Sequence, residues 1–274
     1  MKTWLITGVS RGLGLALAKA ALAHGDNVVG TIRKHVPDIV HASGQLTLIE
    51  VDLLDRAGLE VTVHKAFQAY GRIDVLVNNA GFGLLGVFEN ATDAELQHLF
   101  DVDVFAPMRL TRHALPYFRR QGSGHIVNIT SIAGRAPGAG YALYAAAKAA
   151  MEGFSAALAQ EVRTLGINVT AVAPGQFRTD FLSASSIQRS AGVEAGYSTE
   201  IDAALGNLSR LDQRQLGDPE LAARAIVHMV HCAEPPLQLL LGSDALQRAQ
   251  LKLNAVKEEM ERWKDISVST EISA

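Results

Sequence analysis

The chain has 274 residues, of which 48% are hydrophobic and 19% are charged, and its formal net charge is −3. These values are ordinary for a soluble globular protein with a sizeable core. The charge gives no electrostatic reason to expect nucleic acid or an acidic membrane surface as a partner. The single cysteine, Cys232, excludes an internal disulfide framework and favours a reducing compartment.

The distribution of charged residues bears on the location of the protein. No uncharged run reaches the roughly 18 residues that a membrane-spanning helix needs. The long run at 75–88 is interrupted by asparagine and glycine. The first residues run directly into the apolar stretch TWLITG, so we expect no secretory signal peptide. We therefore expect a cytoplasmic protein without a membrane span.

Short apolar runs rich in β-branched residues alternate with helix-length segments along the chain. This pattern predicts helices such as Leu13–His24 and Arg56–Tyr70. It predicts strands at Trp4–Thr7, Asn27–Ile32, Gln45–Glu50, Ile73–Val77, His125–Thr130, Asn168–Val172 and Leu237–Leu241. The alternation indicates an α/β fold with a single Rossmann-type doubly wound parallel sheet of about seven strands. Because no repeat or linker interrupts the chain, we expect one domain over 1–274.

The alternation breaks in the last third of the chain. Residues 182–217 are rich in Ser, Ala and Gly, which predicts a lid over the substrate. The sequence GDPE then predicts a helix start, with Asp218 as the cap and Pro219 at the first helical position. A C-terminal helix is predicted over 244–263.

That C-terminal helix carries an apolar seam with the spacing 3-4-3-4-3. The seam consists of Leu246, Ala249, Leu253, Val256, Met260 and Trp263. It indicates packing on the helix's own domain, a contact with another subunit, or a wall of the active-site mouth. The seam is shorter than three heptads, so its length does not distinguish among these three possibilities.

A glycine-rich turn, TGVSRGLG, follows the first predicted strand at Thr7–Gly14. The glycines at 8, 12 and 14 let a diphosphate come close to the backbone. The start of the following helix offers free N–H groups and a positive dipole to the same group. This position in an α/β chain predicts a nucleotide site.

The stretch GYALYAAAKAA at 140–150 places Tyr144 and Lys148 four residues apart, on one face of a predicted helix. Tyr141 lies about one turn earlier. A surface helix whose long side chains reach water would also explain the pattern. An ammonium about 5 Å from a phenol favours the phenolate by roughly 3 kcal/mol, so we expect Lys148 to lower the pKa of Tyr144 by about two units.

Residues 3 to 180 resemble the short-chain dehydrogenase/reductase family, in particular its branch of steroid and retinol dehydrogenases. The resemblance rests on TGVSRGLG, the VDL that contains Asp52, NNAG at Asn78–Gly81, the IVNITS that contains Ser131, the Tyr144 and Lys148 pair, and PGQFRT at 174–179. In this family the catalytic tyrosine follows the serine by thirteen residues, which selects Tyr144. Tyr141 is then expected to line the substrate pocket.

The resemblance implies an oxidoreductase in which a nicotinamide dinucleotide transfers hydride. Tyr144 would exchange a proton with the substrate oxygen, Ser131 would hydrogen-bond that oxygen, and Lys148 would hold the nicotinamide ribose. The cofactor-binding residues implied by the resemblance are Gly8, Ser10, Arg11, Gly12, Leu13, Gly14, Arg33, Asp52, Leu53, Asn79, Ala80, Gly81, Tyr144, Lys148, Pro174, Gly175 and Thr179.

One catalytic position departs from the family. The chain reads FDVDVF where the family has FDVNVF, so Asp103 stands in place of an asparagine. That asparagine bends its helix and holds, through its main chain, a water that passes protons from the lysine. The aspartate leaves two alternatives, a working enzyme or a catalytically weak NADP(H)-binding regulatory protein.

The end of the second predicted strand bears on the choice of dinucleotide. NAD-selective relatives carry an acid there that binds the adenosine 2′-hydroxyl. This chain has Ile32, followed by Arg33 and Lys34, and Arg11 lies in the glycine motif. Arginine suits a phosphate by charge and by its forked donors, so the sequence favours NADP(H). The alternative is a solvated basic turn.

The candidate substrate pocket is apolar and shows no conspicuous charge. Its residues are Phe82, Leu84, Ile132, Tyr141, Phe177, Phe181 and Leu182. The set favours a hydrophobic ketone, aldehyde or secondary alcohol. The sequence HMVHC at 228–232 has two histidines beside a thiol but no matching second cluster, so we expect a helix face and no metal.

Other functions stay open at this point. A non-catalytic NADP(H) sensor would share the binding fold, although such proteins usually lose the catalytic tyrosine or lysine. An epimerase or dehydratase of the extended relatives would need a larger C-terminal domain than the 95 residues that follow Thr179. A homodimer or homotetramer is expected.

Overall fold

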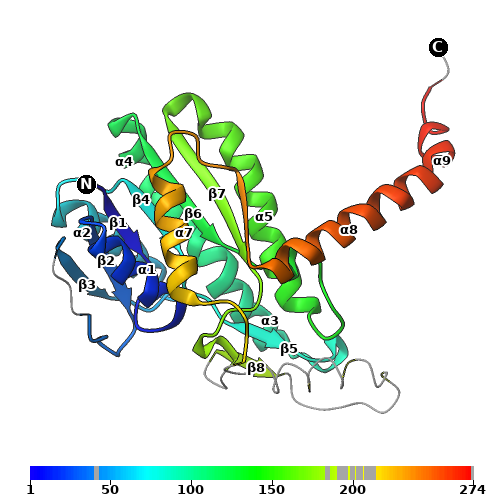
Figure 1. Cartoon of the computed structure of the whole chain (residues 1–274), viewed down its shortest axis with the longest axis horizontal. Coiled ribbons are helices and arrows are strands. Elements are labelled where there is room, and N and C mark those ends of the chain that lie inside the picture. Colours follow the sequence, from blue (N-terminus) through cyan, green and yellow to red (C-terminus); the bar gives the residue numbers. More distant parts are fainter. Residues whose placement is uncertain are drawn as a thin grey trace.

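Seven parallel strands form the central sheet of the computed structural model, which describes residues 1–39, 43–182, 186–189, 197, 201, 206 and 214–272 (Figure 1). The spatial order is β3-β2-β1-β4-β6-β7-β9. The strands span Thr3–Ile6 (β1), Asn27–Ile32 (β2), Leu46–Glu50 (β3), Val75–Asn78 (β4), Gly124–Ile129 (β6), Ile167–Pro174 (β7) and Gln238–Leu241 (β9). All seven predicted strands agree within one or two residues, which confirms the doubly wound α/β fold.

Helices cover both faces of this sheet, because its strands are apolar on both sides. Within β1, Trp4 and Ile6 face one core, and Leu5 faces the other. The first core packs against α1 (Gly12–Ala23) and α7 (Pro219–His231). The second packs against α2 (Arg56–Ala69), α4 (Ala106–Gln121) and α5 (Ala142–Val162). The predicted helices at 13–24 and 56–70 are therefore confirmed.

The segment between β4 and α4 contains an irregular helical turn. Helix α3 spans Asp93–Phe100 and begins with a capping box, in which the Thr92 and Glu95 side chains each accept the other residue's backbone N–H. A wider π-helical turn, η2 (Asp101–Phe105), joins α3 to α4, and the amide of Ala106 donates to the carbonyl of Asp101. Such turns frequently occur at functional sites.

Two three-residue strands form a second, small parallel sheet that the sequence pattern did not predict. They are β5 (Gly83–Leu85) and β8 (Ile187–Arg189). The short helices are η1 (Phe88–Asn90), η3 (Ile132–Gly134), η4 (Arg163–Leu165) and η5 (Asp180–Leu182). Most of the predicted lid at 182–217 lies outside the described residues, so the lid stays a prediction.

The C-terminal part contains three helices. Helix α7 begins as predicted, with the Asp218 side chain accepting the amide of Glu220 and Pro219 in the first turn. Helices α8 (Ser243–Arg262) and α9 (Lys264–Val268) leave the sheet and extend away from it (Figure 1). Within the described chain, none of the helices is both long enough and apolar enough to cross a bilayer.

The strand order reverses beside β1. The chain builds β1, β2 and β3 outward in one direction and then returns to place β4, β6 and β7 on the other side of β1. In doubly wound sheets the crevice outside the carboxyl ends of the strands at this reversal is where ligands bind.

A buried carboxylate ties the opposite ends of the strands together. Asp26 is fully buried and accepts hydrogen bonds from the Lys2 amide at 2.7 Å and from Trp4 Nε1 at 2.9 Å. His231 Nε2 lies 2.7 Å from the same carboxylate, and His24 Nδ1 lies 3.5 Å from it. The expectation that the HMVHC stretch at 228–232 has no matching second cluster was wrong, because the fold brings the end of α7 beside His24 and Asp26, which follow α1.

The hydrogen bonds to Asp26 join separate segments of the chain, so that the cluster forms a structural clamp. Burial raises the pKa of Asp26, but the hydrogen bonds from Lys2, His231 and Trp4 outweigh burial and hold it below its ordinary value. The carboxylate is therefore ionised and His231 donates to it. One acceptor group then satisfies donors from the chain start, β1 and α7.

We predict that Asp26→Asn lowers the free energy of unfolding by about 1–3 kcal/mol at neutral pH, because an amide cannot accept from all these donors. A carboxylate with a depressed pKa stabilises the fold above the unfolded pKa of about 4, and its contribution is lost as pH falls through the folded pKa. Urea unfolding at several pH values should show the two proteins converging in acid. Glu60→Gln, at an exposed position on α2, is the control and should change little. A constant difference down to acidic pH would contradict the clamp.

Candidate active site

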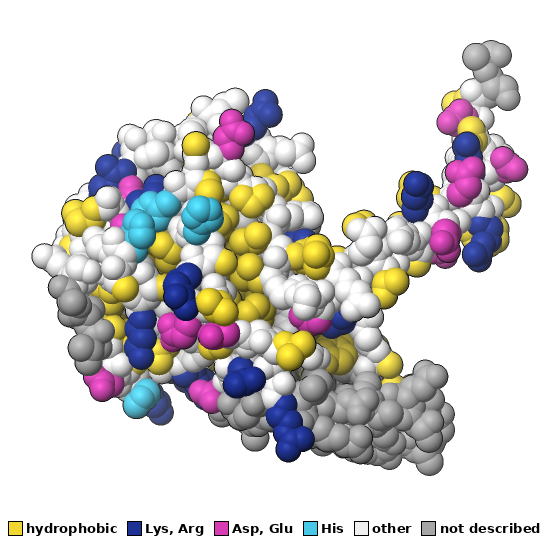
Figure 2. All heavy atoms as spheres, in the orientation of Figure 1, with side chains coloured by type: hydrophobic (Ala, Val, Ile, Leu, Met, Phe, Trp, Pro, Cys, Tyr) yellow, Lys and Arg dark blue, Asp and Glu magenta, His cyan; other side chains and the backbone are white. Residues whose placement is uncertain are grey.

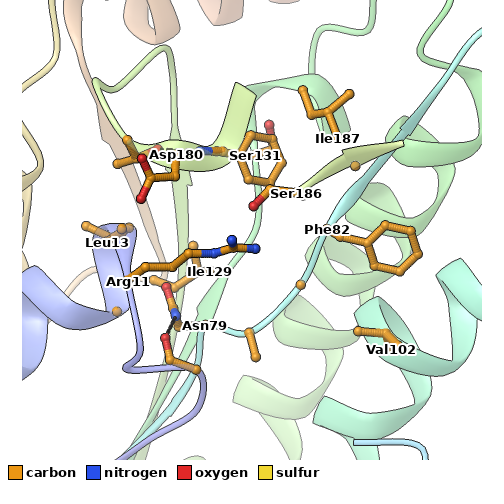
Figure 3. Close-up of a pocket in the computed structure, with 18 of the residues that line it drawn as sticks. Arg11, Leu13, Asn79, Phe82, Val102, Ile129, Ser131, Asp180, Ser186 and Ile187 are labelled. Carbon is orange, nitrogen blue, oxygen red and sulfur yellow. Dashed lines mark hydrogen bonds between the residues drawn. The ribbon is translucent and has the colours of Figure 1, made fainter. Parts of the chain in front are cut away.

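A cavity of about 1000 Å³ lies at the carboxyl ends of the strands, beside the reversal of strand order. In Figure 3, Arg11 and Leu13 extend from the start of α1 on one side of it, and Phe82, Val102 and Ile187 lie on the other. The cavity is lined by every residue that the family resemblance assigns to cofactor binding: Gly8, Ser10, Arg11, Gly12, Leu13, Gly14, Arg33, Asp52, Leu53, Asn79, Ala80, Gly81, Tyr144, Lys148, Pro174, Gly175 and Thr179.

The glycine turn between β1 and α1 fits a diphosphate. Gly8 has a φ of +73°, a conformation that side chains disfavour. A Cβ on Gly14 would meet the Gly8 carbonyl oxygen at 2.2 Å, so only glycine lets the first turn of α1 approach the loop. The side chain of the N-cap residue, Arg11, does not cap α1, which leaves the first amides directed at the cavity.

The residues that follow β2 make one end of the cavity basic. Ile32 is buried there, while Arg33 and Lys34 are exposed at its rim. Asp52, after β3, lines the same cavity. A cationic rim in this place can bind a phosphate on the adenosine ribose.

Two side chains expected to act on the substrate meet in the middle of the cavity. Ser131 is the N-cap of η3, where its hydroxyl accepts the Ala133 amide at 3.1 Å. It is also hydrogen-bonded to Tyr144, which is buried in the first turn of α5. Two hydroxyl groups on separate elements are thereby held at one point.

Lys148 lies one turn after Tyr144 and is buried beneath it, with Nζ 5.6 Å from the centre of the tyrosine ring. Its ammonium donates to the Ile129 carbonyl at 3.4 Å and forms an ion pair of 2.9 Å with Asp103. Burial alone would lower the pKa of Lys148, but Asp103 and Tyr144 raise it. The lysine is therefore held as a cation.

Asp103 lies in the π-helical turn η2, with its side chain fully buried. Its Oδ1 accepts the Phe82 amide at 3.0 Å, and its Oδ2 faces Lys148. Burial raises the pKa of this carboxyl, while Lys148 and the Phe82 amide oppose the rise. The position where the family has an asparagine thus carries the direct partner of the lysine.

The expectation that Tyr144 has a lowered pKa was wrong. Burial raises the pKa of this phenol, Lys148 lowers it, and Asp103 raises it again, and the net shift is upward. The expectation counted the effect of the ammonium but not the burial of the phenol, which is the largest cause of the shift. Tyr144 is therefore a protonated phenol at neutral pH.

Tyr141 immediately precedes α5 and lines the cavity. Burial raises its pKa to about 12, although the nearby Arg248 guanidinium opposes the rise. Lys148 lowers the pKa of Tyr144, whereas no lysine contributes to the shift in the pKa of Tyr141. Tyr141 therefore lies in the wall of the cavity, and its contact with a substrate stays a prediction.

The predicted substrate residues Phe82, Ile132, Tyr141, Phe177 and Phe181 line the cavity. The Phe181 ring lies 5.9 Å from the Tyr144 ring. The side chain of Leu182 lies outside the described part of the structure.

The assignment of Leu84 to this pocket needs correction. Leu84 is buried in a core with Leu99 and Leu143. Successive side chains of a strand point to opposite faces, so in β5 Leu85 faces the cavity and Leu84 faces away.

The sequence also missed several residues of the substrate end. His98, Val102, Ile187 and Arg248 line the cavity from α3, η2, β8 and α8. The substrate end therefore contains the guanidinium of Arg248, contrary to the expectation of no conspicuous charge there. Arg248 already donates to the Ala136 carbonyl. It is 107 residues from Tyr141 in the chain, and only the fold brings the two together.

Residues 2–190 match the family model described as short chain dehydrogenase. Among curated proteins, oxidoreductase BOA17 of Botryotinia fuckeliana is 33% identical over 98% of this chain and 99% of its own length. The 3-ketodihydrosphingosine reductase of Bacteroides thetaiotaomicron is 33% identical over 87% of each chain.

Solved structures of short-chain dehydrogenases are also similar to this chain. A short-chain dehydrogenase from Streptomyces avermitilis has a TM-score of 0.87 and 38% identity, covering 99% of this chain and 98% of its own. A metagenomic short-chain oxidoreductase in complex with NADP has a TM-score of 0.68 and 29% identity, covering 88% and 96%. A Burkholderia phymatum structure in complex with NAD has a TM-score of 0.82 but only 22% identity, covering 94% and 95%, and is similar in fold alone.

Proposed function

The chain belongs to the short-chain dehydrogenase family of oxidoreductases, and from this premise we propose that it is an NADP(H)-dependent reductase of hydrophobic ketones or aldehydes. The reverse reaction would oxidise the corresponding secondary alcohols. The observation that carries the proposal is the hydrogen-bonded pair of Ser131 and the buried Tyr144, held above Lys148 where the glycine turn and the apolar wall share one cavity. The curated ketone reductase noted above supports this substrate class by similarity.

The dinucleotide supplies hydride when bound. Gly8, Gly14 and the start of α1 would hold its diphosphate, and Lys148 its nicotinamide ribose. Phe82, Phe181 and Ile187 would surround the substrate and exclude water. Ser131 would donate a hydrogen bond to the carbonyl oxygen, and Tyr144 would transfer its phenolic proton to that oxygen as the alcohol forms.

The raised pKa of Tyr144 favours the reductive direction. A phenol that is protonated at neutral pH can donate a proton, whereas alcohol oxidation needs the phenolate as a base. Lys148 stabilises the phenolate left after donation, and Asp103 keeps Lys148 charged. The experiment that tests the proposal is a panel of apolar ketones, aldehydes and secondary alcohols, each assayed with NADPH, NADH and their oxidised forms. No turnover anywhere in the panel, with NADPH bound, would favour the regulatory alternative.

The cofactor prediction rests on the cationic rim at the end of β2. NADPH should bind at least tenfold more tightly than NADH, about 1.4 kcal/mol, because Arg33 can pair with a 2′-phosphate. The double substitution Ile32→Asp with Arg33→Ala should erode or reverse this preference. Fluorescence titration gives the two dissociation constants. Equal constants in the unmodified protein would overturn the NADP(H) assignment.

The tyrosine prediction rests on the different surroundings of the two phenols. Tyr144→Phe should abolish turnover while NADPH still binds, because the proton donor is lost. Tyr141→Phe should keep the rate within about tenfold and mainly change substrate preference. Steady-state kinetics on matched substrates separates the two variants. If only Tyr141→Phe lost activity, the assignment of the proton transfer to Tyr144 would be wrong.

The Asp103 prediction follows from its ion pair with Lys148. Asp103→Asn removes a carboxylate that raises the pKa of Tyr144, so the apparent pKa for alcohol oxidation should fall and the pH profile should shift toward lower pH. NADPH affinity should stay nearly unchanged. Identical pH–rate profiles would place Asp103 outside the proton path. Complete loss of activity would give the carboxylate a role that the family's asparagine does not have.

A further inference from the structure

Helix α8 projects from the body of the molecule, and α9 follows it toward the C-terminus (Figure 1). Within the part of the chain that the structure describes, contacts between α8 and the body are confined to its first turns. Ala245 and Ala249 pack with Ile132 and Ala136, and the Asp244 carboxylate accepts the Gln176 amide. Every residue from Gln250 to Ile272 is exposed. We call this exposed part, 250–272, the arm.

The apolar seam of α8 continues along the arm without cover from the described body. Leu253 is 65% exposed, Met260 69% and Trp263 53%, and Leu246 at the base is 62% exposed. Single exposed leucines are common, but a contiguous apolar line marks an interaction site. An isolated helix of this length is also marginal in water, so most of its stability must come from an apolar face that is packed. Packing on its own domain, one of the alternatives left by the sequence, holds only for the first turns.

The charges of the helix identify the partner. The inner half is mainly basic, with Arg248, Lys252 and Lys257 following Asp244. The outer part is mainly acidic, with Glu258, Glu259, Glu261 and Asp265 around Arg262 and Lys264. Figure 2 shows acidic side chains gathered toward the far end of the arm. The acidic outer part disfavours an anionic lipid surface. A helix with opposite charge on its two halves is complementary to a reversed copy of itself.

We propose that the arm pairs antiparallel with the arm of a second copy of this chain, around a twofold axis. Leu253 would then contact the partner's Val256, and Leu246 would contact the partner's Trp263. Lys252 and Glu259 each directly precede a seam residue, so they flank the seam on one side, and Lys252 would pair with the partner's Glu259. A parallel pair would instead bring Lys252 against the partner's Lys257. The antiparallel arrangement is therefore favoured.

Pairing would also connect the interface to the active site. Leu246 and Trp263 are separated by about 26 Å along an ideal helix, so the end of each arm would reach the base of the other. That base carries Arg248, which lines the cavity, and Asp244, which holds the loop after β7. The end of the partner's arm would then support the helix that forms one wall of the substrate end.

The first test measures the molar mass of the full chain by light scattering across a range of concentrations. Leu253→Glu should halve the mass of the assembly or raise its dissociation constant at least tenfold. The matched control is Leu251→Glu, because Leu251 is 62% exposed on the opposite side of the helix and should leave the mass unchanged. Both positions are exposed, so the thermal unfolding of each variant at low protein concentration should match that of the unmodified chain. Equal effects of the two substitutions, or no effect of either, would overturn the proposal.

Two further measurements test the direction of pairing. Lys252→Glu and Glu259→Lys should each weaken the assembly, and the double variant should restore it. In a Cys232→Ser background, proteins carrying Leu253→Cys and Val256→Cys should form a mixed disulfide when combined, whereas Leu246→Cys should not link to itself. Self-linking at 246 would indicate parallel pairing and overturn the arrangement. Binding to anionic vesicles that Leu253→Glu abolishes, with no change in mass, would identify a lipid surface as the partner instead.

Discussion

The ion pair between Asp103 and Lys148 is the interaction on which the candidate site depends. The Asp103 side chain is fully buried and that of Lys148 is only 8% exposed, and each charge alone would be strongly unfavourable there. Together they join the π-helical turn η2 to α5, and the bond from the Phe82 amide adds the segment after β4. Three pieces of chain that surround the reacting position are thereby held by one pair of charges.

The same pair sets the chemical character of Tyr144. A lysine without a partner would act on the phenol with its full charge, whereas here the carboxylate offsets part of that field. Burial of the phenol raises the pKa of Tyr144, and because Asp103 weakens the opposing effect of Lys148, the net shift stays upward. The site thus has the family's arrangement of serine, tyrosine and lysine. Burial and the Asp103 carboxylate keep the tyrosine protonated at neutral pH, so that it can act as a proton donor.

The sequence predicted the sheet well, because each strand is a short β-branched run whose burial follows from its own composition. It failed for β5 and β8, because each has only three residues, β5 begins with a glycine, and the two pair across about 100 residues of chain. The cofactor loop was predictable, since the conformation of Gly8 and the close approach at Gly14 leave a local pattern. Three other features could not be predicted, because each depends on a contact between segments far apart in the chain. They are the position of Arg248, the pKa of Tyr144 and the clamp that includes His231. Leu84 was misplaced because the orientation of a strand residue depends on which face the sheet buries.

The π-helical turn links the site to the core in a further way. Helices α3 and α4 would form one continuous helix if η2 did not contain an additional residue, and one residue rotates everything downstream by about 100°. With it, Leu99 faces its core, Asp103 faces Lys148, and Leu110 and Phe118 face the sheet. Deletion of one residue from η2 would make α3 and α4 one regular helix. The residues on one side of the deletion would then be rotated away from the core, from Lys148 or from the sheet. The length of this turn is therefore constrained more strictly than its composition, so that substitutions can alter the chemistry of the site while insertions and deletions would disrupt its geometry.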